Sequence, residues 1–131
     1  MHHTPSGARR IVRHFTLPRW ADHGVPSSPA ELLRLLRILR SEPPSGPPVV
    51  HCSAGIGRTG TLVAIDVAVK RLHTALQTGD DAVLSRAVAL DELLLRLRRQ
   101  RQGLVQTAEQ YVFCYRALLA ELRAATGGDQ Y

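Results

Sequence analysis

The residues of this chain with the clearest chemical potential are a cysteine and an arginine, six positions apart in a glycine-rich segment. Cys52 and Arg58 lie in residues 51–60, which read His-Cys-Ser-Ala-Gly-Ile-Gly-Arg-Thr-Gly. A short apolar run precedes this segment, and a helical pattern begins at Thr61. Backbone N–H groups of a tight turn and of a helix N-terminus carry partial positive charge and bind anions. The segment therefore predicts a cradle for a phosphate group.

The same positive field favours a thiolate. We expect the pKa of Cys52 to lie well below about 8.5, the usual value of a free thiol, which would make the sulfur a nucleophile at neutral pH. The planar guanidinium of Arg58 matches two oxygens of a phosphate. A nucleophilic sulfur beneath a bound phosphate predicts phosphoryl transfer to cysteine. The alternative is an inert buried cysteine in an ordinary strand–turn–helix, which the spacing of the arginine and glycines disfavours.

The pattern His51-Cys52-x5-Arg58-Thr59-Gly60 resembles the signature loop of the cysteine-dependent protein tyrosine phosphatases, tyrosine-specific branch. The resemblance implies hydrolysis of phosphotyrosine through a phosphocysteine intermediate, without metal or cofactor. It implies that Thr59 hydrogen-bonds Cys52 and that His51 modulates the thiolate, although His51 also fits a structural role at a strand end. It further implies a phosphate-binding set made of Ser53, Ala54, Gly55, Ile56, Gly57 and Arg58.

A phosphocysteine mechanism also needs an acid for the leaving group and then a base for water. The candidate is Asp22 in residues 20–26, Trp-Ala-Asp-His-Gly-Val-Pro, which resemble the mobile acid loop of the same family. The resemblance implies that Asp22 fills both roles, with Trp20 and His23 in support. Ala21 stands where the family usually has proline, which would alter closure of the loop. The alternative for Asp22 is an ordinary turn aspartate.

Residues 106–110, Gln-Thr-Ala-Glu-Gln, resemble the glutamine loop of the family. The resemblance implies that Gln106 positions the water of the second step and that Gln110 supports it at the substrate. A plain helix cap at Thr107 explains the same residues without a catalytic role.

Two segments have the composition of strands. Residues 11–17 are rich in β-branched and aromatic side chains, and residues 49–51 form a short apolar run. A helix between them, with a capping box that opens at Ser28 and Pro29 at its first position, predicts a βαβ unit with parallel strands. The proline-rich residues 41–48 are expected to be a connector.

Three further helices are expected, over residues 61–76, over residues 82 to about 101, and after a second capping box that opens at Thr107. The last helix is expected to bury the stripe Tyr111, Cys114, Tyr115, Leu118 and Leu122. We therefore predict an α/β domain over residues 10–125, with a small, mostly parallel sheet, at least four helices and loose tails at 1–9 and 126–131. It would resemble the C-terminal half of a tyrosine phosphatase catalytic domain.

The composition of the chain limits the classes of partner that we expect. The chain has 131 residues, a net charge of +6 and sixteen arginines against one lysine, which suggests an anionic partner, with a biased genome or a solvated basic surface as the equal alternative. An arginine-rich nucleic-acid binder is an alternative, but no recognition motif is present and we do not expect nucleic acid. Two cysteines make no disulfide framework, and the histidines show no metal-ligand spacing. A reactive thiol and the lack of an apolar run long enough to span a bilayer predict a cytoplasmic protein, or the cytoplasmic side of a larger parent.

The family resemblance reaches from about Arg10 to Leu122 but covers only the C-terminal half of the catalytic domain. The segment that recognises phosphotyrosine and several strands of the sheet would lie upstream. Two strands leave open edges, so the chain is expected to need the missing N-terminal half or a partner for stability. A truncated, weakly active or inactive module that binds phosphate or phosphotyrosine remains the second function, separated from the enzyme by turnover of a small aryl phosphate.

Overall fold

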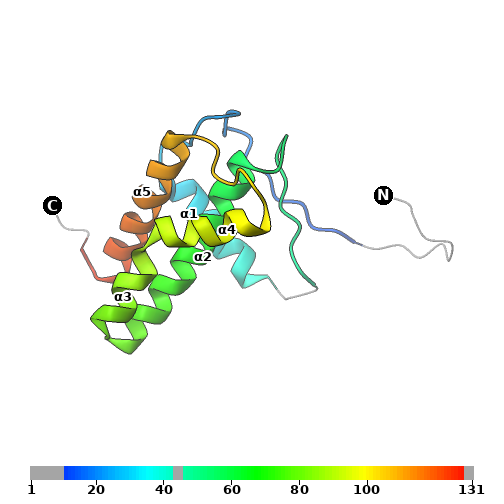
Figure 1. Cartoon of the computed structure of the whole chain (residues 1–131). Coiled ribbons are helices and arrows are strands. Elements are labelled where there is room, and N and C mark those ends of the chain that lie inside the picture. The colour runs from blue at the N-terminus through cyan, green and yellow to red at the C-terminus, as the bar shows by residue number, and fades with distance from the viewer. Residues whose placement is uncertain (1–10, 43–45, 129–131) are drawn as a thin grey trace.

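The regular structure of the described chain is helical. The computed structural model describes residues 11–42 and 46–128, and within these it has α1 (Pro29–Ser41), α2 (Gly57–Thr78), α3 (Asp81–Val88), α4 (Leu90–Gln100) and α5 (Ala108–Ala125). The 22-residue α2 contacts α3, α4 and α5, while α1 packs on α5 (Figure 1). The prediction of at least four helices is confirmed.

The core forms around α2. Its buried positions recur every three or four residues, the period of one helix face: Thr61, Ala64, Ile65, Ala68, Val69, Leu72 and Ala75. Leu32 of α1, Leu93 of α4 and Phe113 of α5 are almost completely buried in the same cluster. Burial of such side chains is the main force that holds the helices together.

Local signals in the sequence place the helix ends. The Ser28 hydroxyl accepts a hydrogen bond from the Ala30 amide, and Pro29 opens α1. Thr107 and Gln110 form the reciprocal capping box of α5, as predicted. The main difference is α2, which begins at Gly57, inside the Cys52–Arg58 segment and four residues before the expected start.

The helix expected over residues 82 to about 101 is two helices. The break lies at Ala89, whose ψ of 79° is not helical. Ala89 is a strong helix former, and neither glycine nor proline lies beside it, so we attribute the break to packing. Both α3 and α4 contact α2, and they leave Ala89 in different directions (Figure 1).

The buried stripe predicted for α5 is partly wrong. Cys114 and Leu118 are buried as expected, but Tyr115 is 41% exposed, and Tyr111 and Leu122 are only half-buried. The buried face also includes Gln110, Phe113, Ala117 and Glu121. Apolar residues lie on more than one side of this helix, so the face turned to α1 and α2 follows from packing.

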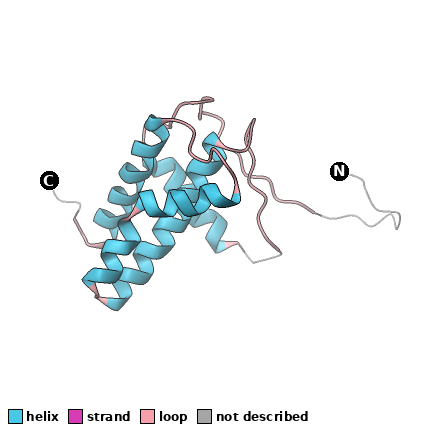
Figure 2. Cartoon of the chain, in the orientation of Figure 1, coloured by secondary structure: helices cyan, strands magenta, loops and turns pink. Residues whose placement is uncertain are grey.

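The predicted small parallel sheet is wrong. Residues 11–17 and 46–51 run as loops, and Figure 2 draws no strand in the described part of the chain. The two segments approach at His14 and His51, whose rings stack with centroids 6.4 Å apart. No backbone hydrogen bond joins them among the described residues. A strand pair with no further neighbour is marginal at best, which explains the loss of regular pairing.

Apolar side chains on these segments face solvent as a result. Ile11, Val12 and Val49 are 95%, 75% and 89% exposed. Of the predicted tails and connector, residues 1–10, 43–45 and 129–131 lie outside the described residues. At the other end, the Gly128 amide donates to the Arg123 carbonyl at 2.9 Å and closes the last turn of α5.

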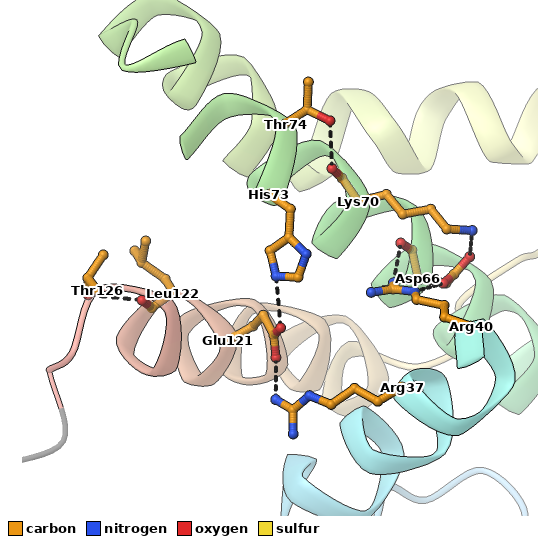
Figure 3. A network of polar contacts seen from close by, with 9 residues as sticks. All are labelled: Arg37, Arg40, Asp66, Lys70, His73, Thr74, Glu121, Leu122 and Thr126. Carbon is orange, nitrogen blue, oxygen red and sulfur yellow. Dashed lines mark hydrogen bonds and ion pairs between the residues drawn. The ribbon is translucent and has the colours of Figure 1, made fainter. Parts of the chain in front are cut away.

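A buried carboxylate links three helices. Glu121 of α5 has a side chain only 8% exposed and accepts hydrogen bonds from Arg37 of α1 at 2.8 Å and His73 of α2 at 2.9 Å (Figure 3). Nearby, Asp66 of α2 pairs with Arg40 of α1. A buried charge is costly unless it is paired, so this cluster favours one arrangement of α1, α2 and α5.

We predict that Glu121→Gln lowers the free energy of unfolding by about 1–3 kcal/mol, because the neutral amide weakens two charge-assisted hydrogen bonds in a buried place. Urea denaturation followed by circular dichroism measures this loss. Glu92→Gln is the control, since Glu92 is exposed on α4. An equal loss in both variants would contradict the role given to the cluster.

Candidate active site

The Cys52–Arg58 segment forms a turn that leads directly into α2. Gly55 has a φ of 71°, a left-handed conformation that glycine adopts without strain. The Gly55 amide donates to Cys52 Sγ at 3.2 Å. The thiol is partly buried at the base of this turn. The sulfur thus lies where backbone N–H groups and the N-terminus of α2 converge, as the sequence predicts.

This environment ionises the thiol more easily. Partial burial alone raises the pKa of Cys52, but hydrogen bonds from the Thr59 hydroxyl and from the amides of Thr59, Gly55 and Ile56 outweigh it and lower the pKa from 9.0 to about 7. The Thr59 hydroxyl is buried and makes no hydrogen bond of standard geometry within the described chain. Its effect on the sulfur is nevertheless the largest of those that lower the pKa of Cys52. The lowered pKa makes a thiolate accessible at neutral pH.

Arg58 joins the turn to the predicted acid loop. Its Nη1 donates to the Trp20 carbonyl at 3.0 Å, and its Nη2 donates to Ser53 Oγ at 2.7 Å and lies 3.1 Å from Asp22 Oδ1. Its Nε is buried and has no partner among the described residues. A buried N–H donor costs free energy when it is unpaired, so this nitrogen favours an oxyanion at the turn.

The predicted acid loop, residues 20–26, is anchored in the core. Trp20 is 6% exposed, packs on Phe113 of α5 and donates from Nε1 to the Gly24 carbonyl at 2.9 Å. His23 has a φ of 60°, and the Gly24 amide donates to the Ala21 carbonyl at 3.2 Å. The buried indole of Trp20 and the tight turn at residues 21–24 thus fix this loop beside the cysteine turn.

The turn and the loop bring Asp22 to Arg58. Ser53 Oγ donates to Asp22 Oδ2 at 3.1 Å, so arginine, serine and aspartate form a chain of hydrogen bonds. The hydrogen bond from Ser53 is the main cause that lowers the pKa of Asp22, and Arg58 and His23 add to it against partial desolvation. The carboxyl is therefore ionised at neutral pH when the site holds no other anion.

The two predicted glutamines lie against the first residue of α2. A side chain on Gly57 would come within 3.0 Å of Gln106 Oε1 and 3.2 Å of Gln110 Nε2. Gln110 is completely buried, accepts from the Gln106 amide at 2.9 Å and from the Thr107 amide at 3.4 Å, and donates to the Gly24 carbonyl at 3.4 Å. One buried amide thus ties the start of α5 to the acid loop.

A close backbone contact fixes the approach to Gln106. Val105 has a φ of 59°, which is strained for a β-branched residue, and its amide donates to the Ile56 carbonyl at 3.1 Å. A Cβ on Gly60 would lie 2.5 Å from Val105 N and 3.0 Å from Leu104 Cα. Gly60 is therefore needed for packing between α2 and this loop.

Two arginines at the end of α4 were missed as site residues. The sequence shows Arg98 and Arg101 only as part of a basic cluster near a helix end. In the structure Arg98 donates to the Leu104 carbonyl at 2.9 Å and the Val105 carbonyl at 2.8 Å, while Arg101 donates to Gly55 and Ala54. Their spacing of three residues, which puts both on one face just before Gly103, was the available signal.

Other predicted residues lie apart from these contacts. His51 is exposed and stacks on His14, and no hydrogen bond to Cys52 is found in the described chain. Cys114 is 3% exposed, and burial raises its pKa to about 12, so the prediction of a core cysteine is confirmed. In residues 11–42 and 46–128 no group of three His, Cys, Asp or Glu side chains is placed to hold a metal ion. None of the described helices is long and apolar enough to cross a membrane.

The sequence matches that of known phosphatases over most of its length. The family model described as protein-tyrosine phosphatase matches residues 1–120. The chain is 45% identical over 118 residues to the protein-tyrosine-phosphatase PTP1 of Arabidopsis thaliana, covering 89% of this chain and 32% of that protein. It is 40% identical over 125 residues to the tyrosine-protein phosphatase non-receptor type 13 of Mus musculus, covering 95% of this chain and 5% of that protein.

Solved structures agree with this match. The crystal structure of the Trypanosoma cruzi protein tyrosine phosphatase TcPTP1 aligns with a TM-score of 0.60 and 40% identity, over 86% of this chain and 34% of that one. The chain therefore spans about a third of the plant relative and of the trypanosome structure. The resemblance to a partial tyrosine phosphatase domain is confirmed.

We predict that Gly60→Ala destabilises the fold by about 1–3 kcal/mol, because the added methyl meets backbone atoms that cannot move without shifting Val105 and Gln106. Denaturation and vanadate binding measure the two effects. Gly128→Ala is the control, since its nearest atoms would be at ordinary contact distances of 3.6–3.7 Å. Unchanged stability and unchanged vanadate binding in Gly60→Ala would contradict this packing role.

Proposed function

The chain belongs to the protein-tyrosine phosphatase family, and from that membership we propose that it hydrolyses phosphotyrosine in proteins through a phosphocysteine intermediate. One arrangement carries the proposal. Asp22 comes from a different segment than Cys52 and Arg58, yet Ser53 and Arg58 both contact Asp22 at 3.1 Å, and the Gly55 amide lies 3.2 Å from Cys52 Sγ. A nucleophile, an anion-binding group and a carboxyl are the parts that phosphate-ester cleavage needs.

In the first step the Cys52 thiolate attacks phosphorus. The S–P bond forms, the bond from phosphorus to the tyrosine oxygen breaks, and Asp22 gives its proton to that oxygen. The amides of residues 53–58 and the guanidinium of Arg58 hold the three remaining phosphoryl oxygens, with Arg58 Nε as a donor that has no protein partner in the described chain.

Substrate binding prepares Asp22 for this role. Without substrate its pKa is lowered, first by Ser53 and then by the charges of Arg58 and His23. A phosphate dianion that engages Arg58 compensates that charge and adds negative charge beside the carboxyl, so it raises the pKa of Asp22. The carboxyl is then protonated in the complex, where an acid is needed, and ionised in the free enzyme.

In the second step water replaces the sulfur. Gln106 orients a water molecule, Asp22 takes one of its protons, the new P–O bond forms, and the S–P bond breaks to release the Cys52 thiolate. Gln110 keeps Gln106 in place through the hydrogen bond to its backbone. Thr59 beside the sulfur stabilises the departing thiolate. No metal or cofactor takes part in this scheme.

Kinetics of three variants test the proposal. Cys52→Ser should abolish hydrolysis of p-nitrophenyl phosphate and of phosphotyrosine peptides while vanadate still binds. Asp22→Asn should slow turnover by about 10²–10⁴-fold, the usual worth of a positioned general acid. The loss should be smaller for phenols with a low pKa, which leave without a proton. Asp91→Asn, which changes an exposed aspartate of α4, is the control.

Two results would contradict the mechanism. Full activity in Cys52→Ser would remove the nucleophile, and an equal loss for all leaving groups in Asp22→Asn would remove the general acid. Binding of phosphate with no turnover of any aryl phosphate by the native chain would instead favour a phosphate-binding module.

We also propose that residues 11–17 and 46–51 pair with strands of further polypeptide, such as the rest of the family domain. Three observations support this proposal. The apolar side chains of these segments are exposed, and the segments do not pair within the described chain. The chain also matches only about a third of the length of the plant relative and of the trypanosome structure. Unpaired apolar edges favour association with other chains.

For the isolated chain we predict binding of the dye ANS and association at high concentration. Replacing Ile11 and Val49 by lysine should reduce both without loss of helix, because these side chains face solvent and pack on nothing. Gln77→Lys combined with Ser85→Lys adds the same two charges at exposed positions of α2 and α3 and serves as the control. Dye binding that is unchanged in the double variant would place the apolar surface elsewhere.

Localisation follows from the same chemistry. We propose a cytoplasmic site of action, because a partly accessible thiolate at Cys52 persists only in a reducing compartment.

A further inference from the structure

The guanidinium of Arg101 contacts the cysteine turn from outside. Arg101 follows α4, and its own amide donates to the Leu97 carbonyl at 3.1 Å, which fixes its backbone. Its Nε donates to the Gly55 carbonyl at 3.1 Å, and its Nη2 donates to the Ala54 carbonyl at 3.2 Å. One planar fork therefore holds two consecutive carbonyl groups of the turn.

These two carbonyls decide where two N–H groups point. The Ala54 carbonyl shares a peptide group with the Gly55 amide, and the Gly55 carbonyl shares one with the Ile56 amide. In a trans peptide the C=O and N–H bonds point in opposite directions, and no cis bond is found in the described chain. Carbonyls turned out to Arg101 therefore turn both N–H groups in, and the Gly55 amide lies 3.2 Å from Cys52 Sγ.

We propose that Arg101 is a positioning residue that keeps the N–H groups of Gly55 and Ile56 directed at Cys52 Sγ and at the phosphate bound there. This rests on the proposed phosphatase function and assigns part of its anion binding to a residue outside the turn. The amides of Gly55 and Ile56 are also two of the groups that lower the pKa of Cys52. Loss of Arg101 frees both peptide groups to rotate, and the thiolate then loses donors.

The neighbourhood of Gly55 agrees with this role. A Cβ on Gly55 would lie 3.3 Å from Arg101 Nη2, closer than ordinary contact. Glycine at this position therefore serves both the left-handed φ of the turn and the approach of the guanidinium.

Arg98 provides an internal comparison. It lies three residues earlier on α4 and donates to the carbonyls of Leu104 and Val105, in the loop that leads to Gln106. Arg98 and Arg101 thus hold two different loops from one helix end. A change at Arg98 acts first on the glutamine loop and reaches the cysteine turn only through the hydrogen bond from the Val105 amide to the Ile56 carbonyl, whereas Arg101 contacts the cysteine turn directly.

The test is the pH dependence of Cys52 alkylation by iodoacetamide in the full 131-residue chain, followed by mass spectrometry. The native midpoint is expected near the Cys52 pKa of about 7. Cys114 is buried and does not compete. In Arg101→Gln we expect the midpoint to rise by about one pH unit, which slows alkylation about tenfold below pH 7. Arg101→Lys should show a smaller rise, since an ammonium replaces the fork poorly.

Arg99→Gln removes the same charge from the same helix end and is expected to keep the native midpoint. Arg99 is exposed and makes no hydrogen bond or ion pair within the described chain. Circular dichroism of each variant verifies folding. If Arg101→Gln does not fold, the alkylation midpoint of Arg101→Lys is used in its place.

A native midpoint in folded Arg101→Gln, or in Arg101→Lys where that variant carries the test, would overturn the proposal. An equal rise in Arg99→Gln would also overturn it, because the effect would then be one of net charge. Alkylation needs no turnover, so a chain that fails to hydrolyse phosphotyrosine can still show the Arg101 effect. A chain that hydrolyses it without the effect rejects Arg101 alone.

Discussion

The structure of the site depends on keeping backbone N–H groups directed at one sulfur atom. A thiolate in a protein requires donors to replace the water it loses, and here the amides of Gly55, Ile56 and Thr59 supply them. The positive ends of several peptide dipoles converge in such a turn and repel one another, so the turn needs contacts from outside to hold its shape. Gly55 supplies the unusual φ, and Arg101 takes the outward carbonyls.

The same end of the molecule gathers three loops around the first turn of α2. The Ile56 carbonyl accepts hydrogen bonds from the amides of Gly60 and Val105, which joins the cysteine turn to the loop before α5. Gln110 extends this link to the Gly24 carbonyl. Because these contacts are buried and run between backbone and side chain, a shift in one loop disturbs the other two.

Ionisation and binding are coupled in this arrangement. The chain of hydrogen bonds from Arg58 through Ser53 to Asp22 holds the acid loop over the turn while the carboxyl is charged. In the mechanism that we propose, an incoming phosphate competes for Arg58, so it weakens this chain of hydrogen bonds and raises the pKa of Asp22 in the same event. The proposal thus makes the carboxyl an acid only when an anion occupies the site.

The sequence alone determined the family and indicated the chemistry that we propose, because reacting groups depend on residue type and local spacing. For that reason the sequence was sufficient to identify Cys52, Arg58, the capping box at Thr107 and the family. The residues that hold the cysteine turn and its neighbouring loops in place were decided only by the tertiary structure. Arg101 acts on a turn 46 residues away in the chain, and local patterns do not encode such distances. Residues 11–17 and 49–51 have the composition of strands, yet a strand exists only where a neighbour accepts its hydrogen bonds, and the described chain offers none.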